Sequence, residues 1–219
     1  MAFKDLKRLL PAPKGAKVIE VGCGEGSFVS DARVGGFDAE GIELNAAAVR
    51  AAVARGIPVR HVDVAEAAAA NAGAADAVCA FQVLEHVPEV GAFLESCVRM
   101  LKPGGLLVLC VPNAQSYLRD LDVPLDMPPH HMSRWSGGAL AALSTVLPVD
   151  LEITREEPLR RTHVRAYVAA QAARSRALGR PAWTSGRAAR AATMALLYAG
   201  LRHLARGQSI YAVLRRRSA

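Results

Sequence analysis

Short apolar segments alternate with amphipathic or alanine-rich segments along the first half of the chain. The apolar segments are rich in Val, Ile and Leu, which is typical of strands buried in a parallel sheet. We expect strands at residues 17–21, 37–44, 58–62, 77–81 and 106–111. Helices are predicted between them at 27–34, 46–55 and 90–101, with an alanine-rich segment at 65–75. This alternation predicts an α/β fold with a doubly wound, mostly parallel sheet.

Both ends of the chain carry further helical patterns. Leu6, Leu9 and Leu10 recur at helical spacing among lysines, which predicts a short amphipathic helix before residue 11. Near the other end, helices are expected at about 163–178 and 187–206.

A glycine-rich turn follows the first predicted strand in the sequence V-I-E-V-G-C-G-E-G-S-F. Its glycines allow backbone conformations and close approaches that a Cβ atom would block. The helix that follows directs unpaired N–H groups at the same place. The G-x-G-x-G spacing here, with Glu20 two residues ahead, differs from the G-x-G-x-x-G of dinucleotide-binding proteins. The turn therefore predicts a small-molecule cleft.

Polar side chains stand at or just beyond the ends of four predicted strands: Glu20, Glu43, Asp63 and Gln82. Ligands of doubly wound sheets bind at this edge, so one pocket can collect all four. Taken singly, Glu43 and Asp63 could each be an ordinary loop acid or a helix cap. Their joint position after consecutive strands favours ligand binding.

The composition adds a marked asymmetry of charge. The 219 residues are 52% apolar and 21% charged, which suits one globular domain. Residues 1–154 carry a net charge of −5, whereas residues 155–219 hold 14 Arg against 2 Glu, a net charge of +12. An acidic body with a basic last section disfavours a general nucleic-acid-binding function.

Cysteine usage and hydropathy indicate a cytoplasmic protein. Four cysteines lie in or beside predicted buried segments without metal-ligand spacing, so we expect reduced core thiols and no metal site. The first 17 residues lack the apolar stretch of a secretory signal. The least polar later run, residues 191–201, is too short to cross a bilayer. The protein is expected to be soluble or peripheral to the inner face of a membrane.

Five segments resemble, in order, the motifs of the class I S-adenosylmethionine-dependent methyltransferases. They are V-I-E-V-G-C-G-E-G-S-F, G-I-E-L-N, V-D-V, D-A-V-C-A-F-Q-V-L-E-H-V and L-K-P-G-G-L-L-V-L-C-V-P-N. The resemblance implies a Rossmann-like, seven-stranded sheet with a reversed final strand, and it places the last two strands at 148–156 and 209–215. It divides a single domain, 1–219, into an N-terminal helix (1–16), a cofactor-binding core (17–154), a basic helical insert (155–208) and a final strand with a basic tail (209–219).

The same resemblance implies S-adenosyl-L-methionine as the cofactor. The glycine turn and the end of the fourth strand would line its methionine and ribose portions, and Glu20 would lie near the ammonium group. The residues assigned to this end are Glu20, Gly22, Cys23, Gly24, Gly26, Phe81 and Gln82.

The nucleoside end is assigned to the residues that follow the second and third strands. Glu43, with Leu44 beside it, is expected to accept both ribose hydroxyls through its two carboxylate oxygens. Asp63 is expected to accept from the adenine amino group, with Val64 beside the ring.

The polar segment 113–136 is the expected acceptor side. It is long for a connection, and long loops over an active site are usually functional. Its run P-P-H-H-M-S-R-W-S is similar to a signature of methyltransferases that act on natural products, sugars, quinones and cell-envelope compounds. A hydroxyl acceptor must lose a proton, which a histidine can accept. We therefore predict His131, or else His130, as the catalytic base; the alternative is that each imidazole only fixes the loop by hydrogen bonds.

Other polar residues near this segment receive secondary roles. Tyr117, Arg134 and Trp135 are candidates for contact with the acceptor. Glu85 and His86 fit structural hydrogen bonding better than catalysis. Three acids could hold a divalent ion, but their spacing matches no known ligand set and favours solvated side chains: Asp120, Asp122 and Asp126.

Two interpretations fit the basic insert. Its second helix has an apolar stripe, Met194, Leu197, Tyr198, Leu201 and Leu204, which could cover the sheet or the acceptor pocket while arginines face water. Alternatively, the arginines with Trp183 and Tyr198 bind an anionic membrane surface or a phosphate-bearing acceptor.

The function that best unites these features is methyl transfer from S-adenosylmethionine to a hydroxyl oxygen of a small-molecule or lipid-linked acceptor, by in-line displacement. N-methylation and C-methylation remain open, as does a regulatory or partner protein that binds the cofactor without chemistry. The glycine spacing disfavours a nicotinamide dehydrogenase.

Overall fold

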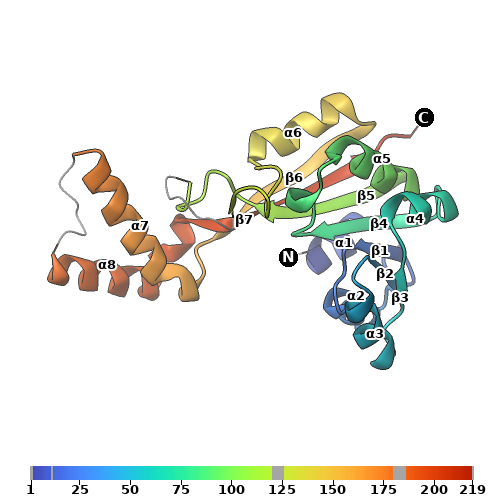
Figure 1. The fold of residues 1–219 in the computed structure, drawn as a ribbon, viewed down its shortest axis with the longest axis horizontal. Coiled ribbons are helices and arrows are strands. Elements are labelled where there is room, and N and C mark those ends of the chain that lie inside the picture. The colour runs from blue at the N-terminus through green and yellow to red at the C-terminus, as the bar shows by residue number, and fades with distance from the viewer. Residues whose placement is uncertain (1, 11, 120–125, 180–185, 219) are drawn as a thin grey trace.

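The computed structural model describes residues 2–10, 12–119, 126–179 and 186–218 (Figure 1). These residues form one seven-stranded sheet in the order β3-β2-β1-β4-β5-β7-β6. The first five strands pair in parallel, and β7 is antiparallel to both β5 and β6. The doubly wound α/β fold with a reversed last strand is therefore confirmed. The strands are β1 (Lys17–Val21), β2 (Asp38–Glu43), β3 (Val59–His61), β4 (Ala75–Phe81), β5 (Leu101–Pro112), β6 (Val149–Pro158) and β7 (Arg206–Arg216).

Helices cover both faces of this sheet, and each face has its own apolar core. One core joins α1 (Ala2–Leu9), α2 (Ser27–Val34) and α3 (Ala46–Ala54) to the sheet. The other core joins α4 (Val64–Ala70), α5 (Val90–Met100) and α6 (Gly137–Val146). Because both faces are covered, strand residues such as Leu106 and Leu107 are fully buried although they point to opposite faces.

Most expected elements lie within a few residues of the observed ones, but the helix expected at about 187–206 ends at Ala199. The strand expected at 106–111 begins at Leu101, because Leu101 already pairs with Ala75 before the register shifts. Helix α6 was not expected. It begins where the Ser136 hydroxyl accepts from the Ala139 N–H at 3.2 Å, and it buries Leu140 against the sheet.

The basic insert extends beyond the sheet instead of covering a face of it (Figure 1). It contains η3 (Arg161–His163), α7 (Val164–Ala177), α8 (Arg187–Ala199) and η4 (Leu201–Leu204). Its apolar residues form a third cluster in which Leu197 of α8 packs with Val164 and Val168 of α7. The second helix therefore does not cover the sheet: Leu197 packs against α7, whereas Leu201 and Leu204 of the expected stripe are exposed. That the insert covers the acceptor pocket stays a prediction. Trp183 lies outside the described residues.

Candidate active site

The glycine-rich turn joins β1 to α2 under tight steric limits. Gly22 has a φ of +68°, and a Cβ atom there would lie 2.5 Å from Cγ2 of Val83. Gly24 has a φ of +54° and nothing within 4 Å of its ideal Cβ position, so its Cα faces open space. The N–H groups of Gly22 and Cys23 donate to the Ile42 carbonyl at 2.9 and 3.2 Å. The turn is therefore fastened to β2 and carries bare backbone at the sheet edge.

Glu43, the last residue of β2, is held by two backbone N–H groups. Its Oε2 accepts from Gly24 at 2.9 Å and its Oε1 accepts from Asn45 at 2.8 Å. Each carboxylate oxygen has a second lone pair, so these bonds orient the group without using up its capacity to accept.

Asp63 follows β3 and begins helix α4. Its Oδ1 accepts from the Glu66 N–H at 2.8 Å, which makes it the N-cap of α4. The helix-cap role considered for this residue is thus present. It leaves Oδ2 for another donor, and the residue also lines the cleft described next.

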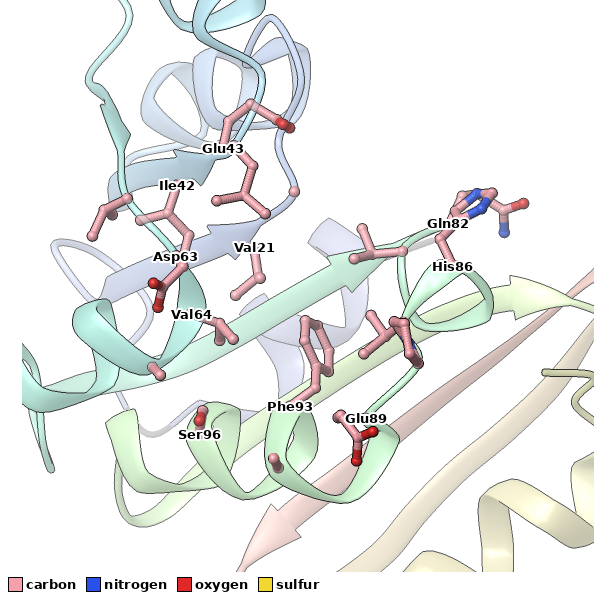
Figure 2. A pocket seen from close by; sticks show the side chains of 18 residues that line it. Val21, Ile42, Glu43, Asp63, Val64, Gln82, His86, Glu89, Phe93 and Ser96 are labelled. Carbon is pink, nitrogen blue, oxygen red and sulfur yellow. The ribbon is translucent and has the colours of Figure 1, made fainter. Parts of the chain in front are cut away.

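A largely apolar cleft of about 570 Å³ opens where these strands end (Figure 2). In Figure 2 the ends of the strands carrying Val21 and Ile42 face Phe93 and Ser96 of α5 across this space. Of the cofactor residues expected from the sequence, six line it: Gly22, Glu43, Leu44, Asp63, Val64 and Gln82.

The other expected cofactor residues lie around the cleft without lining it. Cys23 points into the core, where its Sγ would be 2.4 Å from a Cβ atom on Gly41, and burial raises the pKa of its thiol to about 12. Gly26 packs below the turn against Ile57. Phe81 makes an edge-to-face contact with Phe28, with ring centroids 4.8 Å apart. Gly24 borders the site only through its bond to Glu43.

Glu20 lies behind the turn as a buried acid. It is 6% exposed, its Oε2 has no hydrogen-bond partner among the described residues, and the Val29 N–H of α2 donates to the carboxyl. Burial raises the pKa of Glu20 to about 8, and the nearby Glu43 charge adds to the increase. Because the folded-state pKa is the higher one, this group favours the folded state most below about pH 4.5 and loses that contribution as the pH rises toward 8. A cation placed beside it would offset the cost of its ionisation.

Gln82 adopts a strained backbone conformation at the end of β4. Its φ is +55°, and among the described non-glycine residues only Gln82 has a positive φ. Its N–H donates to the Cys110 carbonyl at 2.7 Å, which holds this geometry. Strained residues of this kind cluster at ligand sites.

The sequence analysis missed the wall formed by η1 (Leu84–His86) and α5. His86, Val87, Pro88, Glu89, Phe93 and Ser96 all line the cleft. The motif V-L-E-H-V-P after the fourth strand was visible, but His86 was interpreted as structural.

His131 lies beside this wall and is paired with an acid. Its Nδ1 is 3.0 Å from Oδ1 of Asp126, and its side chain is 15% exposed. Its ring makes an edge-to-face contact with that of His86, with centroids 4.9 Å apart. His130 is exposed, and its backbone carbonyl accepts from Nδ1 of His86 at 2.7 Å. The geometry therefore distinguishes the two histidines and favours His131 as the functional one.

The secondary acceptor candidates have different surroundings. Tyr117 is buried in the third cluster beside Tyr167, with ring centroids 5.6 Å apart. Trp135 is buried, and its Nε1 donates to the Ser133 hydroxyl at 2.9 Å. Arg134 is exposed and shares a small hollow with His131. Asp120 and Asp122 lie outside the described residues.

No helix within the described parts of the chain has both the length and the apolar content needed to cross a membrane.

Comparison with known proteins identifies the family of the chain. Residues 2–145 match the family described as "Methyltransferase domain". A relative from Mycolicibacterium smegmatis, named among the S-adenosylmethionine-dependent methyltransferases, is 33% identical over 153 residues, which are 68% of this chain and 57% of that protein. A ubiquinone biosynthesis O-methyltransferase of Bradyrhizobium sp. is 34% identical over 116 residues, 51% of this chain and 46% of that protein. The chain thus spans about half the length of the curated relatives that it matches.

The fold is also similar to that of solved methyltransferase structures. A SAM-dependent methyltransferase from Archaeoglobus fulgidus superposes with a TM-score of 0.62 at 18% identity, over 98% of this chain and 92% of that one. At this identity the likeness concerns the fold alone. The family match over residues 2–145 shows that the chain belongs to the methyltransferase domain family, within the class I S-adenosylmethionine-dependent methyltransferases, and the likeness in fold agrees with this.

Proposed function

We propose that the chain transfers the methyl group of S-adenosylmethionine to a hydroxyl oxygen of a small-molecule or lipid-linked acceptor. The observation that carries this proposal is that the cofactor cleft and the candidate base His131 lie on either side of His86. His86 lines the cofactor cleft on one side and contacts the ring of His131 on the other. A donor cleft and a candidate base therefore share a wall.

The cleft fits the cofactor in size and chemistry. Ligand pockets of about 300–1,000 Å³ with few polar groups are typical for small molecules. Glu43 is positioned to accept from the ribose hydroxyls, and Asp63 keeps one oxygen for the adenine amino group. Glu20 offers a buried carboxyl whose ionisation an ammonium group would favour.

When bound, S-adenosylmethionine supplies a methyl group on a positively charged sulfur. His131, held through Nδ1 by Asp126, keeps Nε2 for the proton of the acceptor hydroxyl. The acceptor oxygen forms the new bond to the methyl carbon, and the electron pair of the broken carbon–sulfur bond remains on sulfur. Relatives named as ubiquinone biosynthesis O-methyltransferases favour oxygen over nitrogen or carbon as the acceptor atom.

Calorimetry tests the cofactor part of this proposal. We expect S-adenosylhomocysteine to bind with one site per chain and NAD to give no heat of binding, because the glycine spacing and the acids after β2 and β3 suit the methyl donor. Incubation with methyl-labelled S-adenosylmethionine and phenolic or lipid acceptors then measures turnover. Tight binding of NAD without a response to S-adenosylhomocysteine contradicts the proposal.

We also propose that the basic insert contacts an anionic membrane face, so that the enzyme acts as a peripheral protein. Leu196, Leu201 and Leu204 are exposed in this insert, which also carries the exposed Arg165 and Arg187. Exposed apolar side chains among arginines favour binding to acidic headgroups. We expect the protein to sediment with phosphatidylglycerol vesicles at low salt and less at high salt. Absence of sedimentation at low salt contradicts this part of the proposal.

A further inference from the structure

Three side chains from two separate parts of the sequence converge at the rim of the cofactor cleft. Glu85, His86 and His131 each offer one ligand atom, and these atoms lie within 4.8 Å of one another. The convergence is built by the backbone, since the Glu85 carbonyl accepts from the N–H groups of Met132 at 2.7 Å and Ser133 at 3.3 Å. The segment that follows His131 is therefore fastened directly to η1.

Both imidazoles have an oxygen partner at Nδ1. His86 Nδ1 lies 2.7 Å from the His130 carbonyl, which can only accept, so this nitrogen carries a proton. His131 Nδ1 lies 3.0 Å from the carboxylate of Asp126 and is protonated for the same reason. Each neutral ring thus keeps its lone pair on Nε2. Metal-bound histidines commonly donate their other N–H to a carbonyl or carboxylate in this manner.

Glu85 supplies a buried acid without a complete set of partners. Its side chain is 2% exposed and its Oε2 has no hydrogen-bond partner within the described residues. Its Oε1 is 4.0 Å from Nε2 of His86. Burial raises the pKa of this carboxyl. A buried acid of this kind is costly unless a cation or a donor faces it.

We propose that Glu85, His86 and His131 bind one divalent transition-metal ion through a carboxylate oxygen and the two Nε2 atoms. Two imidazoles with one carboxylate favour ions such as Zn²⁺ or Co²⁺ over Mg²⁺ and Ca²⁺, which prefer oxygen ligands. Ligands about 2.1 Å from such an ion lie about 3.5 Å apart, so the three groups move inward by about 1 Å on binding. Three protein ligands leave a position open for water or an acceptor oxygen.

The location of this ion connects it to the chemistry. Because His86 also lines the cleft, the ion lies between the donor site and the acceptor segment. This role rests on the proposed function: a bound ion would bind the acceptor oxygen and lower the pKa of its hydroxyl, whose proton would pass to water. His131 Nε2 has one lone pair, so the residue acts through the ion whenever the ion is bound and as the base only in its absence.

Metal titration of the full chain without a histidine tag tests the site. We expect one equivalent of Zn²⁺ by elemental analysis after dialysis, and one equivalent of Co²⁺ with visible absorption bands that saturate at that ratio. Glu85→Gln, His86→Ala and His131→Ala are each expected to weaken Co²⁺ binding by more than about 100-fold, and Asp126→Asn by about 10–100-fold. His130→Ala is the matched control, because it keeps the backbone carbonyl that holds His86 and should leave Co²⁺ affinity unchanged.

The outcomes separate this inference from the proposed function. Absence of stoichiometric binding, or binding that survives both Glu85→Gln and His131→Ala, overturns the metal site. Circular dichroism of each variant identifies losses that come from unfolding, and the conservative Glu85→Gln and Asp126→Asn changes then decide. S-adenosylhomocysteine calorimetry on the same samples is independent. If S-adenosylhomocysteine binds but neither Zn²⁺ nor Co²⁺ does, the metal site alone is overturned; if the metal binds but S-adenosylhomocysteine does not, the methyl-transfer proposal is overturned.

Discussion

Replacement of His131 by alanine is expected to lower the kcat of methyl transfer by about 10²–10⁴-fold, the range typical of a lost general base or of the group that replaces it. The expected loss follows from geometry, because Asp126 fixes Nδ1 of His131 and directs Nε2 away from that bond. His131 does not line the cofactor cleft, so the affinity for S-adenosylhomocysteine should change by less than about twofold. Turnover and calorimetry on the same preparation measure both quantities.

The neighbouring histidine provides the comparison. His130→Ala removes an exposed imidazole and leaves its carbonyl on His86, so we expect a much smaller loss of kcat. Equal and unchanged turnover in both variants would sink the catalytic assignment. Turnover of the unmodified chain in the presence of a chelator distinguishes the two roles of His131: a loss assigns the acceptor proton to the metal-bound path, and retention assigns it to Nε2.

Replacement of Glu43 by alanine is expected to weaken S-adenosylhomocysteine binding by about 10²–10⁴-fold. Hydrogen bonds to a charged group contribute about 1.5–3 kcal/mol each, and two ribose hydroxyls are proposed to donate here. The variant also releases the Gly24 and Asn45 N–H groups, which loosens the turn on one side and the start of α3 on the other. Glu43→Gln, which keeps the shape and one acceptor, should fall between alanine and the native residue.

Glu25 is a suitable control for Glu43. It lies in the same glycine-rich turn but is exposed and pairs with Arg55 at 3.3 Å, away from the residues that line the cleft. Glu25→Ala should therefore bind S-adenosylhomocysteine like the native chain. A similar loss in both variants would indicate a general effect of negative charge near the turn and would contradict the ribose assignment.

The donor half of the site was accessible from sequence because it is built from local rules. Strand ends in a parallel sheet share one edge, so Glu43 and Asp63 could be placed together from their positions after two predicted strands. The glycine spacing predicted the turn, and helix α2 was expected at the residues where it occurs. The sequence could not show that Cys23 turns into the core, because its direction depends on Gly41 in the neighbouring strand.

The acceptor half was less accessible because long-range backbone contacts assemble it. Residues 85 and 132 meet through a carbonyl and an N–H group, which every non-proline residue possesses, so no side-chain pattern signals the pairing. From the sequence, His86 was therefore assigned to structural hydrogen bonding, and Asp126 was interpreted as a solvated side chain. Helix α6 was missed for a related reason, since its small and apolar residues give little amphipathic contrast.

The donor and acceptor halves of the site are supported by different apolar clusters. Tyr117, from the acceptor segment, is buried with α7 and α8, and Gln115 accepts from Arg206 at 3.2 Å, whereas the donor cleft is supported by the two cores on the sheet. We therefore expect sequence change in the insert to affect the proposed acceptor side more than donor binding. A chimera that exchanges residues 113–119 together with 159–206 is expected to accept a new substrate and to keep the same methyl donor. Natural sequence change in these two segments is expected to have the same effect.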